Sequence, residues 1–310
     1  MDIIKVALEY FHPWPNSAGF YTARYKGWFK DAGLDVRFYA PDAGYGDSLA
    51  YLTNGQTDFA IAPSNRLLVR HDQGEAIKGI AAINHRGLES IQTITDYNIS
   101  RPKDLEGRRL ALNPTPRGVA MVRHLIKSDG GNPDKVTLVD AGCREMRPEE
   151  LAAGRAEASF GGYWAWEALM PSTIPDNYRV VLPIDQYNIP RYHSYQLCTS
   201  QSYLEKNSEI VRKFLTLIRN GYLEAISNPD TALHAYEEAI PYFPQDLIVK
   251  SLKTIAPTWL DQNGIWGYQN LEIMHEYASW LKQNNIISSE KMGEIAVDNS
   301  FLPSKALPYV

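Results

Sequence analysis

The run Phe160-Gly-Gly-Tyr-Trp-Ala-Trp-Glu167 carries the most specific chemistry in the chain. Its two glycines let the backbone approach a ligand closely, and its aromatic rings offer flat faces for stacking. A glutamate beside such rings accepts hydrogen bonds from ring N–H groups and favours a cationic or amidine-like heterocycle. Tyr163, Trp164 and Glu167 therefore predict a site for a flat nitrogenous ring. The alternative for Tyr163 and Trp166 is packing in the hydrophobic core.

A second aromatic loop follows the first predicted strand, over residues 9–16. Tyr10, Phe11 and Trp14 lie within five positions, in a loop that two prolines stiffen. We interpret these rings as a stacking wall, with Asn16 supplying hydrogen bonds to the ligand. The alternative is that they form a hydrophobic staple under the next helix.

Polar residues follow several other predicted strands. In open α/β sheets the ligand crevice lies beyond the carboxyl ends of the strands, which favours these positions as ligand contacts. Thr115 and Arg117 stand at a predicted helix N-terminus, which suits an anionic group, although a capping threonine and a solvated arginine explain them equally well. Ser64 and Asn65 can cap their helix, meet a ligand, or do both. The remaining candidates of this set are His85 and Tyr187.

No motif for catalysis or cofactor binding is present. The sequence has no GxSxG, HExxH or P-loop, and Gly44-Tyr-Gly46 lacks the third glycine of a dinucleotide fingerprint. The seven histidines and two cysteines show no metal-ligand spacing. We therefore expect no catalytic residue, no metal and no cofactor. The net charge of −5 argues against a nucleic-acid partner, and no apolar run reaches the roughly 18–20 residues that span a bilayer.

Short apolar strands alternate with helical stretches, which predicts an α/β fold with largely parallel sheets. Strands are expected at 5–8, 34–39, 58–62, 109–113, 136–141 and 156–160. Helices are expected at 19–31, 47–54, 118–128, 148–153, 209–227, 230–239, 245–254, 271–284 and 289–295. One pattern recurs: Gly55 and Gly154 each end a helix, and an acidic residue follows three positions later, before a strand. The recurrence predicts two related lobes.

At 310 residues the chain exceeds the usual size of one domain. We expect residues 1–93 plus 190–310 to form one lobe and residues 94–189 to form an inserted second lobe. The chain would cross between them near 91–96 and 180–195, a two-strand hinge suited to closure over a ligand held between the lobes. Each lobe is expected to be a mixed, mostly parallel sheet flanked by helices.

Three segments resemble a known family, that of the thiamine-pyrimidine-precursor binding proteins and synthases. They are the run Trp14–Val36, the motif Gly-Gly-Tyr163-Trp164-x-x-Glu167 and the run Tyr203–Leu215. The resemblance implies a type II periplasmic-binding-protein fold and a monomeric solute-binding component of an ABC importer, with a permease as partner. It also implies a pyrimidine-like ligand, with riboflavin, aromatic amines and sulfonates as alternatives. Tyr10 stands where relatives usually have tryptophan, which leaves room for a different ligand.

The same family includes a cytoplasmic synthase that makes the thiamine pyrimidine from its own histidine and pyridoxal phosphate. The resemblance places the enzyme's lysine and histidine in the stretch Ala62-Pro-Ser-Asn-Arg66, where neither occurs. Its cysteine cluster is also missing from Arg191–Cys198. We therefore expect a binder, and the alternatives are a synthase-like enzyme or a ligand-sensing domain. We expect a periplasmic or extracellular protein if a leader has been removed, and a cytoplasmic one if Met1 is the native start.

Overall fold

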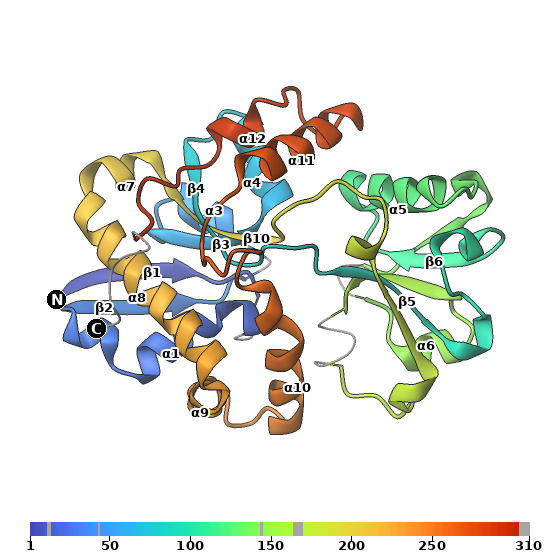
Figure 1. Ribbon diagram of the computed structural model, residues 1–310, viewed down its shortest axis with the longest axis horizontal. Coiled ribbons are helices and arrows are strands. Elements are labelled where there is room, and N and C mark those ends of the chain that lie inside the picture. The colour runs from blue at the N-terminus through green and yellow to red at the C-terminus, as the bar shows by residue number, and fades with distance from the viewer. Residues whose placement is uncertain (11–13, 43, 143–144, 164–169, 304–310) are drawn as a thin grey trace. The chain divides into compact units, whose positions relative to one another are not determined.

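The computed structural model describes residues 1–10, 14–42, 44–142, 145–163 and 170–303. The chain forms two compact units (Figure 1). The first comprises Met1–His85, Tyr192–Lys282 and the chain from Ile287 on. The second comprises Arg86–Arg191 and Gln283–Ile286. In the described part, no helix is both long enough and apolar enough to cross a membrane.

A five-stranded sheet forms the centre of the first unit, in the order β2-β1-β3-β10-β4. Its strands are β1 (Asp2–Ala7), β2 (Leu34–Tyr39), β3 (Phe59–Pro63), β4 (Ile77–Ala82) and β10 (Tyr195–Ser200). β1 runs parallel to β2 and β3, whereas β10 runs antiparallel to both β3 and β4. Phe59, Ile61 and Ala62 are all buried, as expected for a strand covered on both faces.

Helices pack around this sheet. They are α1 (Ala18–Tyr25), α2 (Trp28–Asp31), α3 (Ser48–Thr53), α4 (Ser64–Asp72), α7 (Gln201–Lys206), α8 (Ser208–Ser227), α9 (Pro229–Ala239), α10 (Gln245–Ile255), α11 (Leu271–Gln283) and α12 (Met292–Ile295). The helix predicted over 19–31 is split in two, because Gly27 adopts a left-handed conformation at φ 76°. The helix predicted over 289–295 is shorter than expected and begins at Met292.

Helices α1 and α8 lie side by side in the first unit (Figure 1). Their contact is between glycines: a β-carbon on Gly221 would stand 2.8 Å from the carbonyl carbon of Gly19. The ring of Tyr222 covers Gly19, and its hydroxyl donates to the carbonyl oxygen of Asn16. The close approach of these helices therefore also anchors the start of the segment that precedes α1.

The second unit repeats this plan, with the strand order β7-β6-β8-β5-β9. Its strands are β5 (Glu89–Ile94), β6 (Arg109–Leu112), β7 (Thr137–Asp140), β8 (Ala158–Gly162) and β9 (Arg179–Pro183), and its α-helices are α5 (Pro116–Ser128) and α6 (Pro148–Ala152). β6 is parallel to β7 and β8, while β5 is antiparallel to β8 and β9. Ala111, Met146, Leu151 and Ala156 form a buried core cluster.

The recurring glycine–acidic motif has a structural role that is identical in the two units. Gly55 and Gly154 both adopt positive φ, at 70° and 74°. The carboxylate three residues later accepts a hydrogen bond from a backbone N–H of the neighbouring parallel strand. Asp58 accepts from Lys5 at 2.8 Å, and Glu157 accepts from Arg109 at 2.7 Å. The motif thus ties β3 to β1 in the first sheet and β8 to β6 in the second.

Short 3₁₀ turns connect several elements. They are η1 (Pro15–Ser17), η2 (Thr95–Tyr97), η3 (Pro102–Leu105), η4 (Pro133–Lys135), η6 (Asp176–Tyr178), η7 (Ile184–Gln186) and η8 (Ala256–Thr258). The unit boundaries lie at His85/Arg86 and Arg191/Tyr192, whereas the sequence placed them at 93/94 and 189/190. The difference arises because β5 pairs with β8 and β9 along its length. The two-strand hinge stays a prediction.

Candidate ligand-binding site

One edge of the first sheet gathers functional side chains from distant parts of the chain. The parallel strands β1 and β3 end at this edge, and the antiparallel strand β10 begins there, with Tyr195 opposite Pro63. Residues that follow β1 and β3 therefore lie beside residues that start β10. This is the edge at which open α/β sheets bind ligands.

An aromatic corner lies at this edge. The rings of Tyr10 and Trp14 meet edge-to-face, with centroids 5.8 Å apart and planes at 78°. Tyr10 also contacts Tyr195, at 6.2 Å and 62°, and the two hydroxyls share a hydrogen bond. Tyr195 is buried and the pKa of its phenol lies well above the usual value, chiefly because burial disfavours the charged form. Tyr10 and Trp14 are half-buried and lie together as predicted, whereas Tyr195 was not foreseen.

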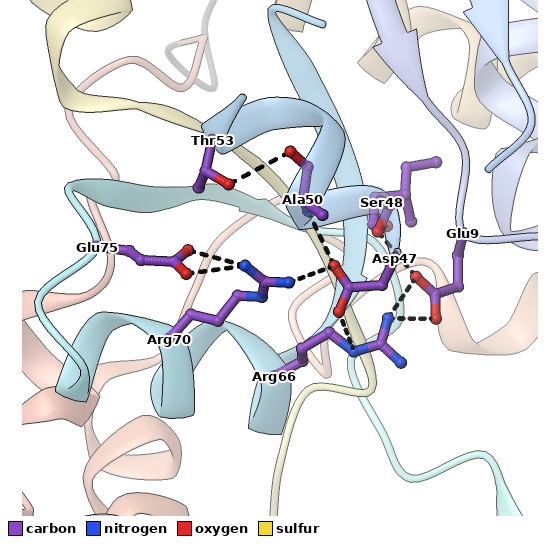
Figure 2. Close-up of polar contacts among 9 residues, drawn as sticks. Glu9, Asp47, Ser48, Ala50, Thr53, Arg66, Arg70 and Glu75 are labelled. Carbon is purple, nitrogen blue, oxygen red and sulfur yellow. Dashed lines mark hydrogen bonds and ion pairs between the residues drawn. The ribbon is translucent and has the colours of Figure 1, made fainter. Parts of the chain in front are cut away.

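Glu9, next to this corner, forms a partly buried ion pair with Arg66. One guanidinium nitrogen, Nη1 of Arg66, donates to both carboxylate oxygens at 2.8 and 3.0 Å. Ser48 Oγ donates to the same carboxylate at 2.9 Å (Figure 2). Burial raises the pKa of Glu9, and the charge of Arg66 opposes that rise.

The ion pair continues outward through a second arginine. Asp47 caps α3 by accepting from Ala50 N at 2.9 Å, and its carboxylate also meets Arg66 Nε at 3.2 Å and Arg70 Nη2 at 2.8 Å. Arg70 in turn donates to Glu75 at 2.8 Å. Figure 2 shows the resulting chain of alternating charges along α4. No role was predicted for these five residues from the sequence.

Asn16 and Ser64 lie close to this edge. Asn16 is buried in η1; its carbonyl oxygen accepts from Tyr222, whereas its side-chain Nδ2 has no hydrogen-bond partner among the described residues. Ser64 is buried as well; its hydroxyl donates to the His193 carbonyl oxygen and accepts from Gln196 Nε2 at 2.9 Å. The capping role considered for Ser64 is wrong, because Pro63 precedes α4 and no side chain caps it. Asn65 is half-buried in the first turn of α4.

His85 lies just beyond β4, beside His193. The imidazoles meet edge-to-face with centroids 5.3 Å apart, and Asn270 N donates to His193 Nε2 at 3.1 Å. Burial lowers the pKa of His85 to about 4 and that of His193 to about 3. The carboxylate of Asp261 opposes the shift at His85; at His193 the charge of His85 lowers the pKa further, and a hydrogen bond to the His85 backbone opposes the shift. Both rings are therefore neutral at pH 7.

In the second unit, Thr115 caps α5 by accepting from Gly118 N at 3.1 Å, which confirms the capping role considered for its side chain. The interpretation of Arg117 as a solvated arginine is wrong, because its side chain is buried and pairs with Glu89, the first residue of β5. The structure therefore disfavours anion binding by Arg117, because Glu89 already neutralises its charge.

The glycine pair of the run 160–167 serves a contact within the chain. Glu145 Oε1 accepts from Gly162 N at 2.6 Å, and a β-carbon on Gly161 would stand 2.8 Å from Glu145 Cδ. Tyr163 is buried, in line with the core alternative. Tyr187 is half-buried near the Arg101–Asp129 ion pair. Phe11, Trp164 and Glu167 lie outside the described residues.

Known proteins resemble this chain in sequence and in fold. A model of the NMT1/THI5-like family matches residues 14–232. The chain belongs to this family. A formylaminopyrimidine-binding protein from Halalkalibacterium halodurans is 23% identical to this NMT1/THI5-like chain over 302 residues, which cover 96% of the chain and 89% of the relative. A 4-amino-5-hydroxymethyl-2-methylpyrimidine phosphate synthase from Saccharomyces cerevisiae is 20% identical over 249 residues, or 77% of the chain and 72% of the enzyme.

Solved structures show the fold of this NMT1/THI5-like protein. The periplasmic aliphatic sulphonate-binding protein SsuA from Escherichia coli superposes with a TM-score of 0.72 at 14% identity, over 96% of this chain and 97% of that one. The chain therefore has the periplasmic-binding-protein fold, with two mixed sheets flanked by helices, as the sequence predicted. Among the described residues, no group of three His, Cys, Asp or Glu side chains could hold a metal ion.

Proposed function

We propose that this protein is a solute-binding protein that captures a small planar nitrogenous ring of the pyrimidine class. The observation that carries the proposal is the aromatic corner at the carboxyl edge of the first sheet, where Tyr10 and Trp14 offer ring faces beside polar side chains. The formylaminopyrimidine-binding relative supports a pyrimidine as the ligand. Stacking against such rings contributes about 0.5–1.5 kcal/mol beyond burial of apolar area.

Further parts of the proposal rest on the sequence. Trp164 and Glu167 are proposed to contact the ring from the second unit, with Glu167 accepting hydrogen bonds from an amine or a ring N–H. His85, Asn16, Asn65 and Tyr187 complete the proposed contacts. The prediction that the ligand is held between closing lobes stays a prediction. The partner would be an ABC permease, which places the protein outside the cytoplasmic membrane.

Isothermal titration calorimetry with formylaminopyrimidine and 4-amino-5-hydroxymethyl-2-methylpyrimidine tests the proposal. We expect saturable binding by at least one of them, and a loss of at least tenfold in affinity for Trp14→Ala and for Glu167→Ala. Tyr242→Ala is the matched control, because Tyr242 is an aromatic residue that is 72% exposed. Unchanged affinity in both site variants would show that the ligand binds elsewhere.

A synthase-like activity is the second candidate, because yeast relatives are named as synthases. The residues disfavour it: the stretch Ala62–Arg66, to which the family resemblance assigns the enzyme's lysine and histidine, contains neither, and the Arg66 guanidinium is held by Glu9 and Asp47. Incubation with pyridoxal phosphate followed by borohydride reduction distinguishes the two. A reduced lysine adduct on the chain, with pyrimidine as product, would favour the enzyme.

A further inference from the structure

Carboxylates of the protein bind two of the three guanidinium nitrogens of Arg66. Nη1 donates to Glu9 at 2.8 Å, and Nε meets Asp47 at 3.2 Å. A guanidinium carries five N–H donors in a rigid plane, so fixing two nitrogens also fixes the third. In Figure 2 that nitrogen, Nη2, points away from both carboxylates. Within the described residues it has no acceptor, and the side chain is 33% exposed.

The position of Arg66 places this free edge at the carboxyl end of the first sheet. Arg66 lies in the first turn of α4, directly after β3, and its charge acts on the phenol of Tyr195. Tyr195 contacts Tyr10, which meets Trp14. A ring that stacks on this aromatic corner therefore lies close to a donor whose direction is already set.

The charges around Arg66 sum to a negative value. The network contains three carboxylates, Glu9, Asp47 and Glu75, against two guanidiniums, those of Arg66 and Arg70. The N-terminus of α4 adds a partial charge of about +0.5, which does not reverse the sign. An anionic ligand therefore meets an excess of negative charge next to the Nη2 edge of Arg66.

From this geometry, and resting on the proposed function, we propose that Arg66 is the specificity-determining donor of the site. It recognises an uncharged ring through a carbonyl oxygen or ring nitrogen, and the flanking carboxylates reject sulfonates and phosphate esters. In the second unit, Arg117 of α5 is likewise paired with a carboxylate, that of Glu89. The specificity thus differs from that of the sulphonate-binding protein that shares the fold.

Calorimetry with two matched pairs of compounds tests the proposal. One pair is 4-amino-5-hydroxymethyl-2-methylpyrimidine and its phosphate ester; the other is benzamide and benzenesulfonate. We expect the uncharged member of at least one pair to bind at least 30-fold more tightly than its anion. Binding of benzamide without the pyrimidine would end the pyrimidine proposal and leave this inference standing. Equal or tighter binding of an anion, or no binding by either uncharged ring, would overturn it.

Variants separate recognition from folding. Glu9→Gln/Arg66→Gln removes one charge of each sign and the Nη2 donors together, so that no buried charge is left without its partner. We expect it to keep its circular dichroism spectrum and to lose at least tenfold in affinity for the uncharged ring. Arg70→Gln/Glu75→Gln makes the same change in charge farther along α4 and is expected to stay within threefold. Similar losses in both double variants would contradict a specific role for Arg66.

Asp47→Asn tests the charge argument on its own. It lowers the negative charge beside Arg66 and keeps an oxygen that can accept from Nε. We expect at least a fivefold gain in affinity for the anionic member of the pair, with less than a threefold change for the uncharged member. An unchanged ratio between the two compounds would overturn the proposed rejection of anions.

Discussion

Gly221 and Gly19 meet backbone to backbone where α8 crosses α1. A β-carbon at Gly221 would stand 2.8 Å from the carbonyl carbon of Gly19 and 3.0 Å from its Cα. Real β-carbons almost never approach other atoms so closely, and the neighbour here is main chain, which cannot rotate away. The position therefore requires glycine although it lies in the middle of a helix, where glycine is intrinsically unfavourable by roughly 0.5–1 kcal/mol.

Gly221→Ala is predicted to destabilise the protein by at least about 2 kcal/mol, since overpacking exceeds the gain in helix propensity. Chemical denaturation of the variant measures the effect. Ser227→Ala, at the exposed end of the same helix, is the control and should change the free energy of unfolding by less than about 0.5 kcal/mol. A variant as stable as the parent would show that α1 and α8 are not packed as described.

The neutral pair His85 and His193 predicts a loss of stability in mild acid. Their pKa values are lowered to about 4 and about 3, whereas unfolded histidine titrates near 6.5. Below pH 6.5 these histidines bind protons in the unfolded state but stay neutral in the folded state. The free energy of unfolding therefore falls as the pH falls. The slope is up to about 1.4 kcal/mol per pH unit for each histidine between pH 6 and pH 4.

Urea denaturation across that pH range measures the slope. His85→Gln/His193→Gln should flatten it relative to the parent. His275→Gln should not, because His275 is 47% exposed. A parent slope that survives the double substitution would assign the acid sensitivity to carboxylates instead.

Breaking the Arg117–Glu89 pair is predicted to destabilise the protein strongly, and a second substitution should restore most of the lost stability. The arginine is 10% and the glutamate 24% exposed. Arg117→Met removes the guanidinium that pairs with the Glu89 carboxylate and should cost about 3–5 kcal/mol in the free energy of unfolding. The double variant Glu89→Gln/Arg117→Met should recover most of it. Arg123→Ala breaks an exposed pair with Asp134 and should cost less than about 1 kcal/mol.

Gly161 makes room for the side chain of Glu145. Gly161→Ala should push that carboxylate aside and break its hydrogen bond to Gly162 N, with a cost of about 1–3 kcal/mol. Glu145→Gln keeps an oxygen acceptor and should cost less. Thermal melts of the two variants rank the effects. The opposite order would show that the charge of Glu145, and not its position, stabilises the loop.

Local patterns predicted much of the fold. Strands β1, β2 and β3 and most of the helices follow from apolar periodicity and from glycines at their ends, and the recurring motif at Gly55 and Gly154 predicted the duplicated plan. Strands β4, β5, β9 and β10 were missed; β5 and β10 pair with strands far away in the sequence, and their alternation is weak. β10 joins β3 across more than 130 positions.

The candidate site was foreseen only in part, for the same reason. Tyr10 and Trp14 stand four positions apart, so one loop indicates both. Glu9 and Arg66 are separated by 57 positions, and nothing local to either shows that they pair. Tyr195 escaped notice because the strand that carries it was not predicted.

Because β10 lies between β3 and β4, the first sheet cannot be completed during synthesis until β10 has left the ribosome. All five named strands of the second sheet have been synthesised once Pro183 has emerged, so this sheet can form before Gln283–Ile286, the remaining part of the unit, is made. β4 is made much earlier, yet β10, the strand that pairs with it among the described residues, does not emerge until Tyr195–Ser200. Until then Ile77 and Ile80, both buried in the finished sheet, have no neighbouring strand to cover them. Truncation products that end before residue 195 are therefore expected to aggregate through this strand.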